Sequence, residues 1–236
     1  MNPNIDRSVT YPLDRAAAIS TEFVRGVFAW MFAGLALTSV TALYTAGSPA
    51  LLQAIFGNKM VFYALVFGEL GLVIAISGAI NRLSAGAATG LFLLYSALNG
   101  VTLASIFLVY TGSSIAATFF VSATTFGAMS AYGYLTKKDL TSWGSFLFMG
   151  LIGVVIASLV NMFLHSPMVA WVASVCGVIV FVGLTAYDTQ KIKAIGAAGF
   201  GDESAKRKSS ILGALTLYLD FINIFLMLLN LFGRRR

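Results

Sequence analysis

The chain has 236 residues, of which 58% are apolar and only 10% are charged, and its formal net charge is +6. Soluble domains carry roughly 25% charged residues, so charges this sparse exclude a soluble globule of this size. The mean hydropathy of +0.88 indicates that lipid is the solvent for much of the surface. The basic residues form no stripe interleaved with aromatic residues, so the positive charge does not indicate nucleic-acid binding.

Seven apolar runs each approach the ~20 residues that a membrane span needs. They cover residues 23–44, 60–80, 85–110, 115–135, 143–164, 168–187 and 211–232. Continuous runs of this length predict helices, because barrel strands need only ~9–11 residues with a two-residue alternation. The first run is long and no cleavage site follows it, so we expect it to be a retained span.

The sequence therefore predicts an all-α membrane protein with seven transmembrane helices. We divide it into an N-terminal segment at 1–22, a seven-helix transmembrane domain at 23–233 and a basic C-terminal tail at 234–236. The segment before the last run, 188–210, is rich in glycine and charge and predicts a mobile hydrophilic loop. Cys176, the single cysteine, lies inside an apolar run and is expected to be a small buried residue.

The distribution of Lys and Arg predicts the orientation in the membrane. With seven spans, 11 of the 15 Lys and Arg residues fall on the side of the N-terminus, which we therefore expect to be cytoplasmic. The tail Arg234–Arg236 then lies on the opposite side. If the last run were re-entrant instead, the split would become 14 to one. We prefer seven spans, because ~22 residues at ~1.5 Å each are long enough to cross.

Three carboxylates lie in or beside the predicted spans. Glu69 is near the middle of the second span, Asp220 near the middle of the seventh, and Asp188 at the end of the sixth. An ionisable side chain at mid-membrane costs about 2.5–3.5 kcal/mol on insertion scales, and such residues usually face inward and are paired. These acids are the first candidates for a functional site.

The seventh span also carries a polar stripe at helical spacing. The stripe consists of Thr216, Asp220, Asn223, Met227 and Asn230. A helix that faced only lipid would not carry this stripe, so we expect the seventh span near the centre of the bundle. Two further pairs at a spacing of three residues, Asn99 with Thr102 and Ser158 with Asn161, are expected to form hydrogen bonds between helices.

Two carboxylates brought close together cannot both ionise freely, so the pair can hold a proton near neutral pH. Such a pair could also bind a hard cation such as Ca²⁺ through its oxygen atoms. The alternative is structural: Asp188 caps the sixth span or pairs with a lysine. Residue spacing leaves both readings open. Arg82, at the end of the second span on the same predicted face, is a candidate partner ion.

Catalytic signatures are missing from the sequence, which indicates that the protein is not an enzyme. There is no His-Glu-x-x-His zinc motif, no Gly-x-Ser-x-Gly nucleophile motif and no phosphate-binding Walker A loop. Tyr187-Asp188 and Gly199-Phe-Gly-Asp202 match fragments of an intramembrane aspartyl protease. However, Asp202 lies in a charged segment rather than in a span, so the match lacks the required setting.

Three segments resemble the Bax inhibitor-1 (TMBIM) family of membrane proteins, specifically its bacterial inner-membrane branch. The segments are 126–134, Phe-Gly-Ala-Met-Ser-Ala-Tyr-Gly-Tyr; 182–193, Val-Gly-Leu-Thr-Ala-Tyr-Asp-Thr-Gln-Lys-Ile-Lys; and 211–225, Ile-Leu-Gly-Ala-Leu-Thr-Leu-Tyr-Leu-Asp-Phe-Ile-Asn-Ile-Phe. The resemblance runs across all seven predicted spans. It implies a seven-helix fold in which the last helix is enclosed by the other six.

The resemblance also implies a function, a pH-sensitive calcium leak across the membrane. A di-aspartyl unit from the last two helices is the proton sensor in this family, and Asp188 and Asp220 match its positions. An arginine at the end of the second helix latches onto the first of these aspartates in the closed state, and Arg82 matches it by location. Glu69, Asn223 and Asn99 are candidate pore-lining residues. Calcium is then the transported ion, with Asp188 and Asp220 as its ligands.

A second reading is a membrane regulator of stress or proteolysis that conducts nothing and binds other membrane proteins. In both readings we expect membrane lipid as a partner, no nucleic acid and no permanently bound cofactor. The sequence does not identify protein partners.

Overall fold

A computed structural model of the chain describes the backbone from residue 7 and the side chains from residue 18 onward. The described backbone forms nine helices: α1 Arg7–Ala46, α2 Pro49–Phe56, α3 Lys59–Ala79, α4 Ala85–Leu103, α5 Ile106–Val109, α6 Gly112–Leu135, α7 Thr141–Leu164, α8 Pro167–Ala198 and α9 Glu203–Phe232. Seven of them, α4 counted together with α5, are long and apolar enough to cross a membrane. The predicted all-α, seven-span class is confirmed. Residues 1–6 of the predicted N-terminal segment lie outside the described residues.

Short polar caps separate the helices. The side chains of Ser48, Asn58, Ser84, Thr111, Ser166 and Asp202 each accept a hydrogen bond from a backbone N–H in the first turn of the helix that follows. Such caps satisfy N–H groups that have no partner within the helix. Pro49 and Pro167 occupy the first turn of α2 and α8, where proline removes no helical hydrogen bond. The chain therefore reverses direction within a few residues.

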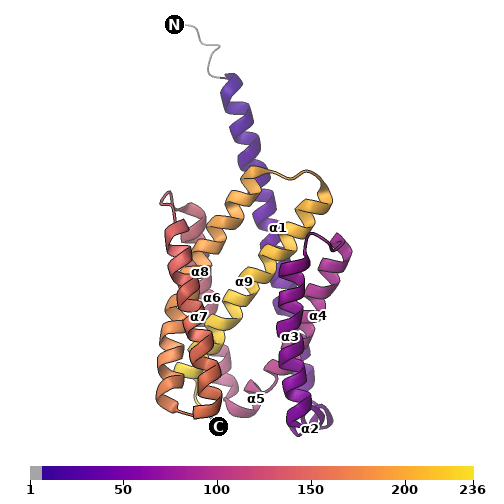
Figure 1. Ribbon diagram of the computed structural model, residues 1–236, viewed down its shortest axis with the longest axis vertical. Helices are drawn as coiled ribbons and strands as arrows, with labels where there is room; N and C mark the ends of the chain where they lie inside the picture. Colours follow the sequence, from indigo (N-terminus) through magenta and orange to yellow (C-terminus); the bar gives the residue numbers. More distant parts are fainter. Residues whose placement is uncertain (1–6) are drawn as a thin grey trace.

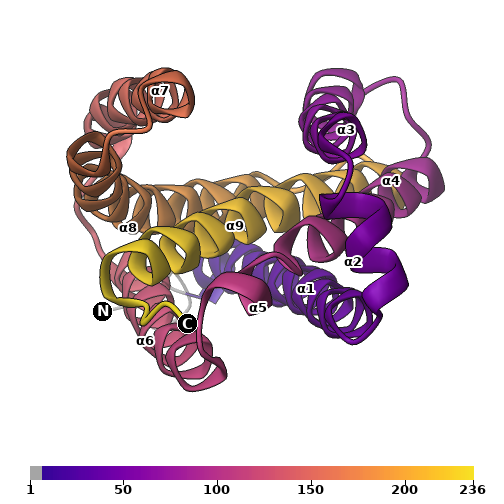
Figure 2. The same ribbon diagram turned by 90° about the horizontal axis from the view of Figure 1, so that it is seen from below.

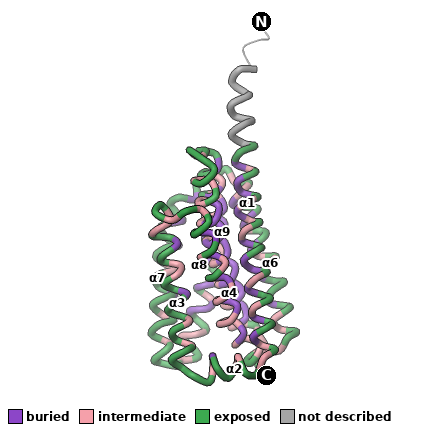
Figure 3. Tube along the Cα trace, turned by 90° about the vertical axis from the view of Figure 1, so that its right-hand side faces the viewer, coloured by how far each residue is buried: buried purple, intermediate pink, exposed green. Residues whose placement is uncertain are grey.

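The last helix, α9, runs through the middle of the bundle. Figure 1 shows it crossing between α7 and α8 on one side and α3 and α4 on the other, and Figure 2 shows α1 beneath it. α9 packs against α1, α4, α6 and α8 and is the most buried span (Figure 3). α3 and α7 stand apart on the remaining side of α9 (Figure 2). The expected central position of the last span is confirmed.

The predicted mobile loop at 188–210 is wrong. α8 continues as a helix to Ala198, and the connection to α9 is only residues 199–202. Gly199 ends α8 with a positive φ of 79°, a conformation that favours glycine. The helices extend because their ends pack against α1: the Ser20 hydroxyl donates to the Lys193 carbonyl oxygen, and Lys206 pairs with Glu22 at 2.8 Å.

The C-terminal tail lies at the end of the bundle opposite to the start of α1 (Figure 1). Its backbone pairs with the connection between α5 and α6: the Thr111 N–H donates to the Arg234 carbonyl oxygen at 3.0 Å, and the Arg236 N–H donates to Val109 at 2.9 Å. α9 thus crosses the full length of the bundle, as seven spans require, and is not re-entrant.

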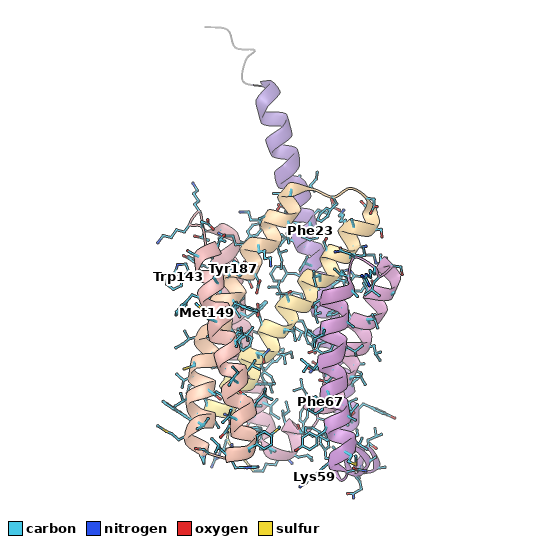
Figure 4. The ribbon with its side chains drawn as sticks, viewed as in Figure 1. Phe23, Lys59, Phe67, Trp143, Met149 and Tyr187 are labelled. Carbon is cyan, nitrogen blue, oxygen red and sulfur yellow. The ribbon has the colours of Figure 1, made fainter. Side chains whose placement is uncertain are left out.

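The two ends of the bundle differ in charge. Figure 4 shows Lys59 at the end opposite to Phe23 and Trp143. Because the spans alternate in direction, Arg82, Lys137, Lys138 and Lys206 lie at the end where α1 enters the bundle.

Cys176 differs from expectation, because its side chain is exposed on the outer face of α8 rather than buried.

Candidate functional site

A cavity of about 850 Å³ lies against α9 on the side where α3 and α7 stand apart. We call it the acidic cavity. Residues from α3, α4, α7, α8 and α9 line it. Its polar and ionisable lining residues are Glu69, Tyr95, Ser145, Tyr187, Asp188, Lys191, Thr216, Asp220 and Asn223. The fold therefore brings all three predicted acids to one place.

Asp188 and Asp220 form a pair across the contact between α8 and α9, and their carboxyl groups interact directly. Asp220 is only 4% exposed, and its Oδ2 atom is buried without a hydrogen-bond partner among the described residues. Two carboxylates that close cannot both carry a charge at low cost, and a shared proton removes the conflict. The pairing expected from the sequence is therefore present.

Among the described residues, Asp188 neither caps a helix nor forms a direct ion pair with a lysine. Asp188 lies ten residues before the end of α8, so it caps no helix. Within the described part of the chain, the ion pairs are those of Lys206 with Glu22 and Glu203, so Asp188 has no direct ion pair with a lysine.

Arg82 does not reach Asp188 in this structure. It lies exposed in the turn between α3 and α4, and its side chain has no ion-pair partner in the described residues. The cation that interacts with Asp188 is Lys191, three residues further along α8. Sequence reasoning missed Lys191 because it assigned this residue to a loop, where helical spacing has no meaning.

Glu69 is 7% exposed and both of its carboxylate oxygens accept hydrogen bonds. Asn99 Nδ2 donates to Oε2 at 3.0 Å, and the Thr102 hydroxyl donates to Oε1. The expected hydrogen bonds between helices from Asn99 and Thr102 are confirmed, and their acceptor is the buried acid of α3. Asn99 thus supports the cavity by holding Glu69, although it is not itself among the lining residues.

A polar chain continues from Glu69 through the centre of the bundle. The Tyr218 hydroxyl of α9 donates to Asn99 Oδ1 at 3.0 Å and lies 2.7 Å from the Thr38 hydroxyl of α1. Tyr218 is fully buried, so these partners are essential for its hydroxyl. The sequence did not single out Tyr218 or Thr38, because one tyrosine or threonine in an apolar run has no pattern of its own.

The polar stripe of α9 divides between two environments. Thr216, Asp220 and Asn223 line the acidic cavity, whereas Met227 packs against Gly177 and Asn230 donates to the Ser174 hydroxyl at 2.8 Å. The predicted inward stripe is confirmed. The expectation for Ser158 and Asn161 is wrong: Ser158 is exposed, and Asn161 accepts from the Ser166 N–H in the adjoining turn.

The site has the chemistry of a proton and cation site rather than of a closed metal centre. Among residues 18–236, no three His, Cys, Asp or Glu side chains gather closely enough to hold a metal ion. The cavity instead offers a carboxyl pair, a third buried acid and the amide and hydroxyl of Asn223 and Thr216. Oxygen atoms of this kind hold protons and weakly coordinate hard cations.

Seven helices that are long and apolar enough to span a membrane, with α9 at their centre and its buried Asp220 beside Asp188, define a polytopic helical membrane protein. The family described as inhibitor of apoptosis-promoting Bax1 matches residues 20–236, nearly the whole chain. The inner membrane protein YbhL of Escherichia coli strain K12 is 56% identical over 215 residues, which cover 91% of this chain and 92% of that protein. Relatives from Borreliella burgdorferi and Rickettsia prowazekii are 49% and 44% identical, over 92% and 89% of this chain and 94% and 88% of their own lengths. The chain belongs to the Bax inhibitor family.

Proposed function

We propose that the protein is a pH-sensitive cation leak channel, with calcium as the transported ion and Asp188 and Asp220 as its proton sensor. The observation that carries the proposal is the buried, directly interacting pair of carboxyl groups inside a cavity of about 850 Å³. The Oδ2 atom of Asp220 has no hydrogen-bond partner among the described residues, which is costly within a membrane span. Ionisable residues inside spans mark ion or proton pathways.

The acidic cavity attracts cations for an electrostatic reason. Glu69, Asp188 and Asp220 place up to three negative charges beside one lysine, Lys191. Low-dielectric walls strengthen the attraction between these charges and an entering cation. Thr216 and Asn223, about one helical turn before and after Asp220 on α9, add neutral oxygen atoms to the lining, which suit a hard cation such as Ca²⁺ without a tight binding site.

The sign of the pH dependence follows from proton linkage. In the proposed closed state Asp188 is ionised and held by a nearby cation, so the closed state binds fewer protons than the open state. Lowering the pH favours whichever state binds more protons. The leak is therefore expected to increase as the pH falls and to decrease as the pH rises.

Calcium flux into proteoliposomes over a range of pH tests the proposal. We expect the Asp188→Asn, Asp220→Asn double variant to lose the pH dependence, because it has no shared proton to release. Asn161→Ser on α7 is a control, since Asn161 bonds only to the adjoining turn. If the double variant kept the wild-type flux and pH profile, the assignment of Asp188 and Asp220 as the proton sensor would be wrong. No flux from the wild-type protein would favour the non-conducting regulator.

The proposed location is the bacterial inner membrane, with the N-terminus in the cytoplasm. The support is the concentration of Lys and Arg at the end of the bundle where α1 enters. In that orientation the carboxyl pair lies nearer to the cytoplasmic end of α8, and the Arg234–Arg236 tail lies on the far side.

A further inference from the structure

A second cavity, of about 420 Å³, lies between α1 and α6 at the end of the bundle where α1 enters. We call it the α1–α6 cavity. Its lining residues are Thr21, Val24, Arg25, Phe28, Gly127, Ser130, Ala131 and Tyr134. It shares no residue with the acidic cavity, and Figure 2 shows α1 and α6 on the side of α9 away from α3 and α7. The α6 residues all belong to the segment 126–134, which contributes nothing to the lining of the acidic cavity.

The Ser130 hydroxyl is a buried polar group in the wall of this cavity. Ser130 is only 5% exposed, and its Oγ atom has no hydrogen-bond partner in the part of the chain that the structure describes. A serine inside a helix commonly donates to the carbonyl oxygen four residues before it, as Ser122 of the same helix does to Thr118 at 2.8 Å. A buried polar group without a partner is costly. Ser130 is therefore expected to bond to a group that enters the cavity.

Arg25 supplies a positive charge at the same cavity. It lies within the apolar span Ala18–Ala46, and its side chain is exposed on the outer surface of the bundle. Within residues 18–236 it forms no ion pair, because the neighbouring acid, Glu22, pairs with Lys206 of α9 at 2.8 Å. An arginine on the lipid-facing surface of a span keeps its charged end in the polar region of the bilayer. There it meets the phosphate groups of lipids.

Hydrogen bonds fix the outer end of the cavity. The Tyr134 hydroxyl lies 3.1 Å from the Thr21 hydroxyl and so joins α6 to α1. Lys193 of α8 donates to the Tyr134 carbonyl oxygen at 2.7 Å, and its Nζ atom lies 4.7 Å from the centre of the Tyr134 ring. Tyr134 is the next to last residue of α6. Tyrosine and lysine at the end of a span are typical of the level where lipid headgroups lie.

We propose that the α1–α6 cavity binds an anionic glycerophospholipid, with its phosphate on Arg25 and the Ser130 hydroxyl and an acyl chain along Phe28 and Gly127. Charge favours this occupant, because the lining residues include a cation and no acid, and Lys193 places a second cation nearby. Basic pockets between transmembrane helices recognise anionic headgroups. The apolar residues of the lining suit an acyl chain, which a free anion lacks. The inference is independent of the proposed leak, since it does not involve the carboxyl pair.

Native mass spectrometry of the purified full-length protein tests the proposal. The probes are phosphatidylglycerol, zwitterionic phosphatidylcholine and inorganic phosphate. We expect phosphatidylglycerol to be retained in preference to phosphatidylcholine, and inorganic phosphate not to displace it. Arg25→Gln should weaken the apparent affinity for phosphatidylglycerol about fivefold, the effect of one Lys or Arg on attraction to an anionic membrane. Ser130→Ala should also weaken this affinity, yet it should leave the lipid-free protein as stable as the wild type, because it removes a hydroxyl that has no partner there.

Gly127→Leu tests the position of the lipid. A Cβ atom on Gly127 would meet nothing within 4 Å, so the leucine fills the cavity without a clash and should abolish the preference for phosphatidylglycerol. Gly153→Leu on α7 is the matched control, since Gly153 is equally open and lines neither cavity. Circular dichroism in detergent checks that each variant folds.

Three results would overturn the proposal. The first is equal retention of phosphatidylglycerol and phosphatidylcholine by the wild type. The second is an unchanged preference in Gly127→Leu, or an equal loss in Gly127→Leu and Gly153→Leu, because the lipid would then lie elsewhere on the surface. The third is displacement of the lipid by inorganic phosphate, which would assign the cavity to a free anion.

Discussion

At the scale of single residues, Tyr218 connects α9 to both α4 and α1. Its hydroxyl links Asn99 and Thr38, and its ring packs edge-on against Phe92 and Tyr95. Through Asn99 it reaches the buried carboxylate of Glu69. Tyr218 lies two residues before Asp220, so any shift of α9 that moves the acid pair also strains this chain of hydrogen bonds.

The Tyr218→Phe variant removes the hydroxyl and keeps the ring. We expect it to lower the free energy of unfolding by about 1 kcal/mol, because the buried Asn99 oxygen loses its donor. Thermal unfolding in detergent measures the change. Tyr132→Phe is the matched control, since Tyr132 is exposed on α6 and is expected to change nothing. Equal stabilities for the two variants would contradict the polar chain.

Residue spacing predicted part of this network. It marked Asn99 and Thr102 as a pair on one helical face, and both donate to Glu69. The same rule failed for Asn161, because a residue near the end of α7 can bond to the following turn instead. Tyr218 and Thr38 could not be predicted, because their partners lie on helices far away in the sequence.

At the scale of elements, α8 and α9 are longer than their apolar segments. The hydropathy of the sequence predicts that a span ends where charged residues begin. The helix itself continues wherever its backbone hydrogen bonds are kept and one of its faces packs against a neighbour. Here Ile192 and Gly196 of α8 are buried, Gly196 against Ser20 and Phe23 of α1. Arg207 of α9 lies 5.5 Å from the Trp30 ring. This tertiary support has no local signature, so the sequence predicted a loop.

Limited trypsin digestion in detergent tests the helical extension. We expect the first cleavage after Lys137 or Lys138, which lie in the non-helical connection between α6 and α7. Cleavage after Lys206, Arg207 or Lys208 should be slower, because a protease needs an extended, open backbone. Mass spectrometry of the early fragments identifies the sites. A first cut within 203–210 would show that the segment is a mobile loop after all.

At the scale of the whole molecule, composition and run length were enough to predict seven spans, and the polar stripe predicted which span is central. The acidic cavity was not predictable. It exists because α3 and α7 stand apart on one side of α9, an arrangement that depends on the packing of every other helix. The resemblance to the family named Asp188 and Asp220 as a pair, but it did not place Lys191 beside them.

The account depends on one proton shared between the carboxyl groups of α8 and α9. Infrared difference spectroscopy of the reconstituted protein, from mildly acidic to mildly alkaline pH, measures that proton through the carbonyl band of a protonated carboxylic acid. We expect a band that disappears as the pH rises, that is absent from the Asp188→Asn, Asp220→Asn variant and that is kept in Glu69→Gln. A band that survives in the double variant and vanishes in Glu69→Gln would contradict the account, because the proton would then belong to Glu69.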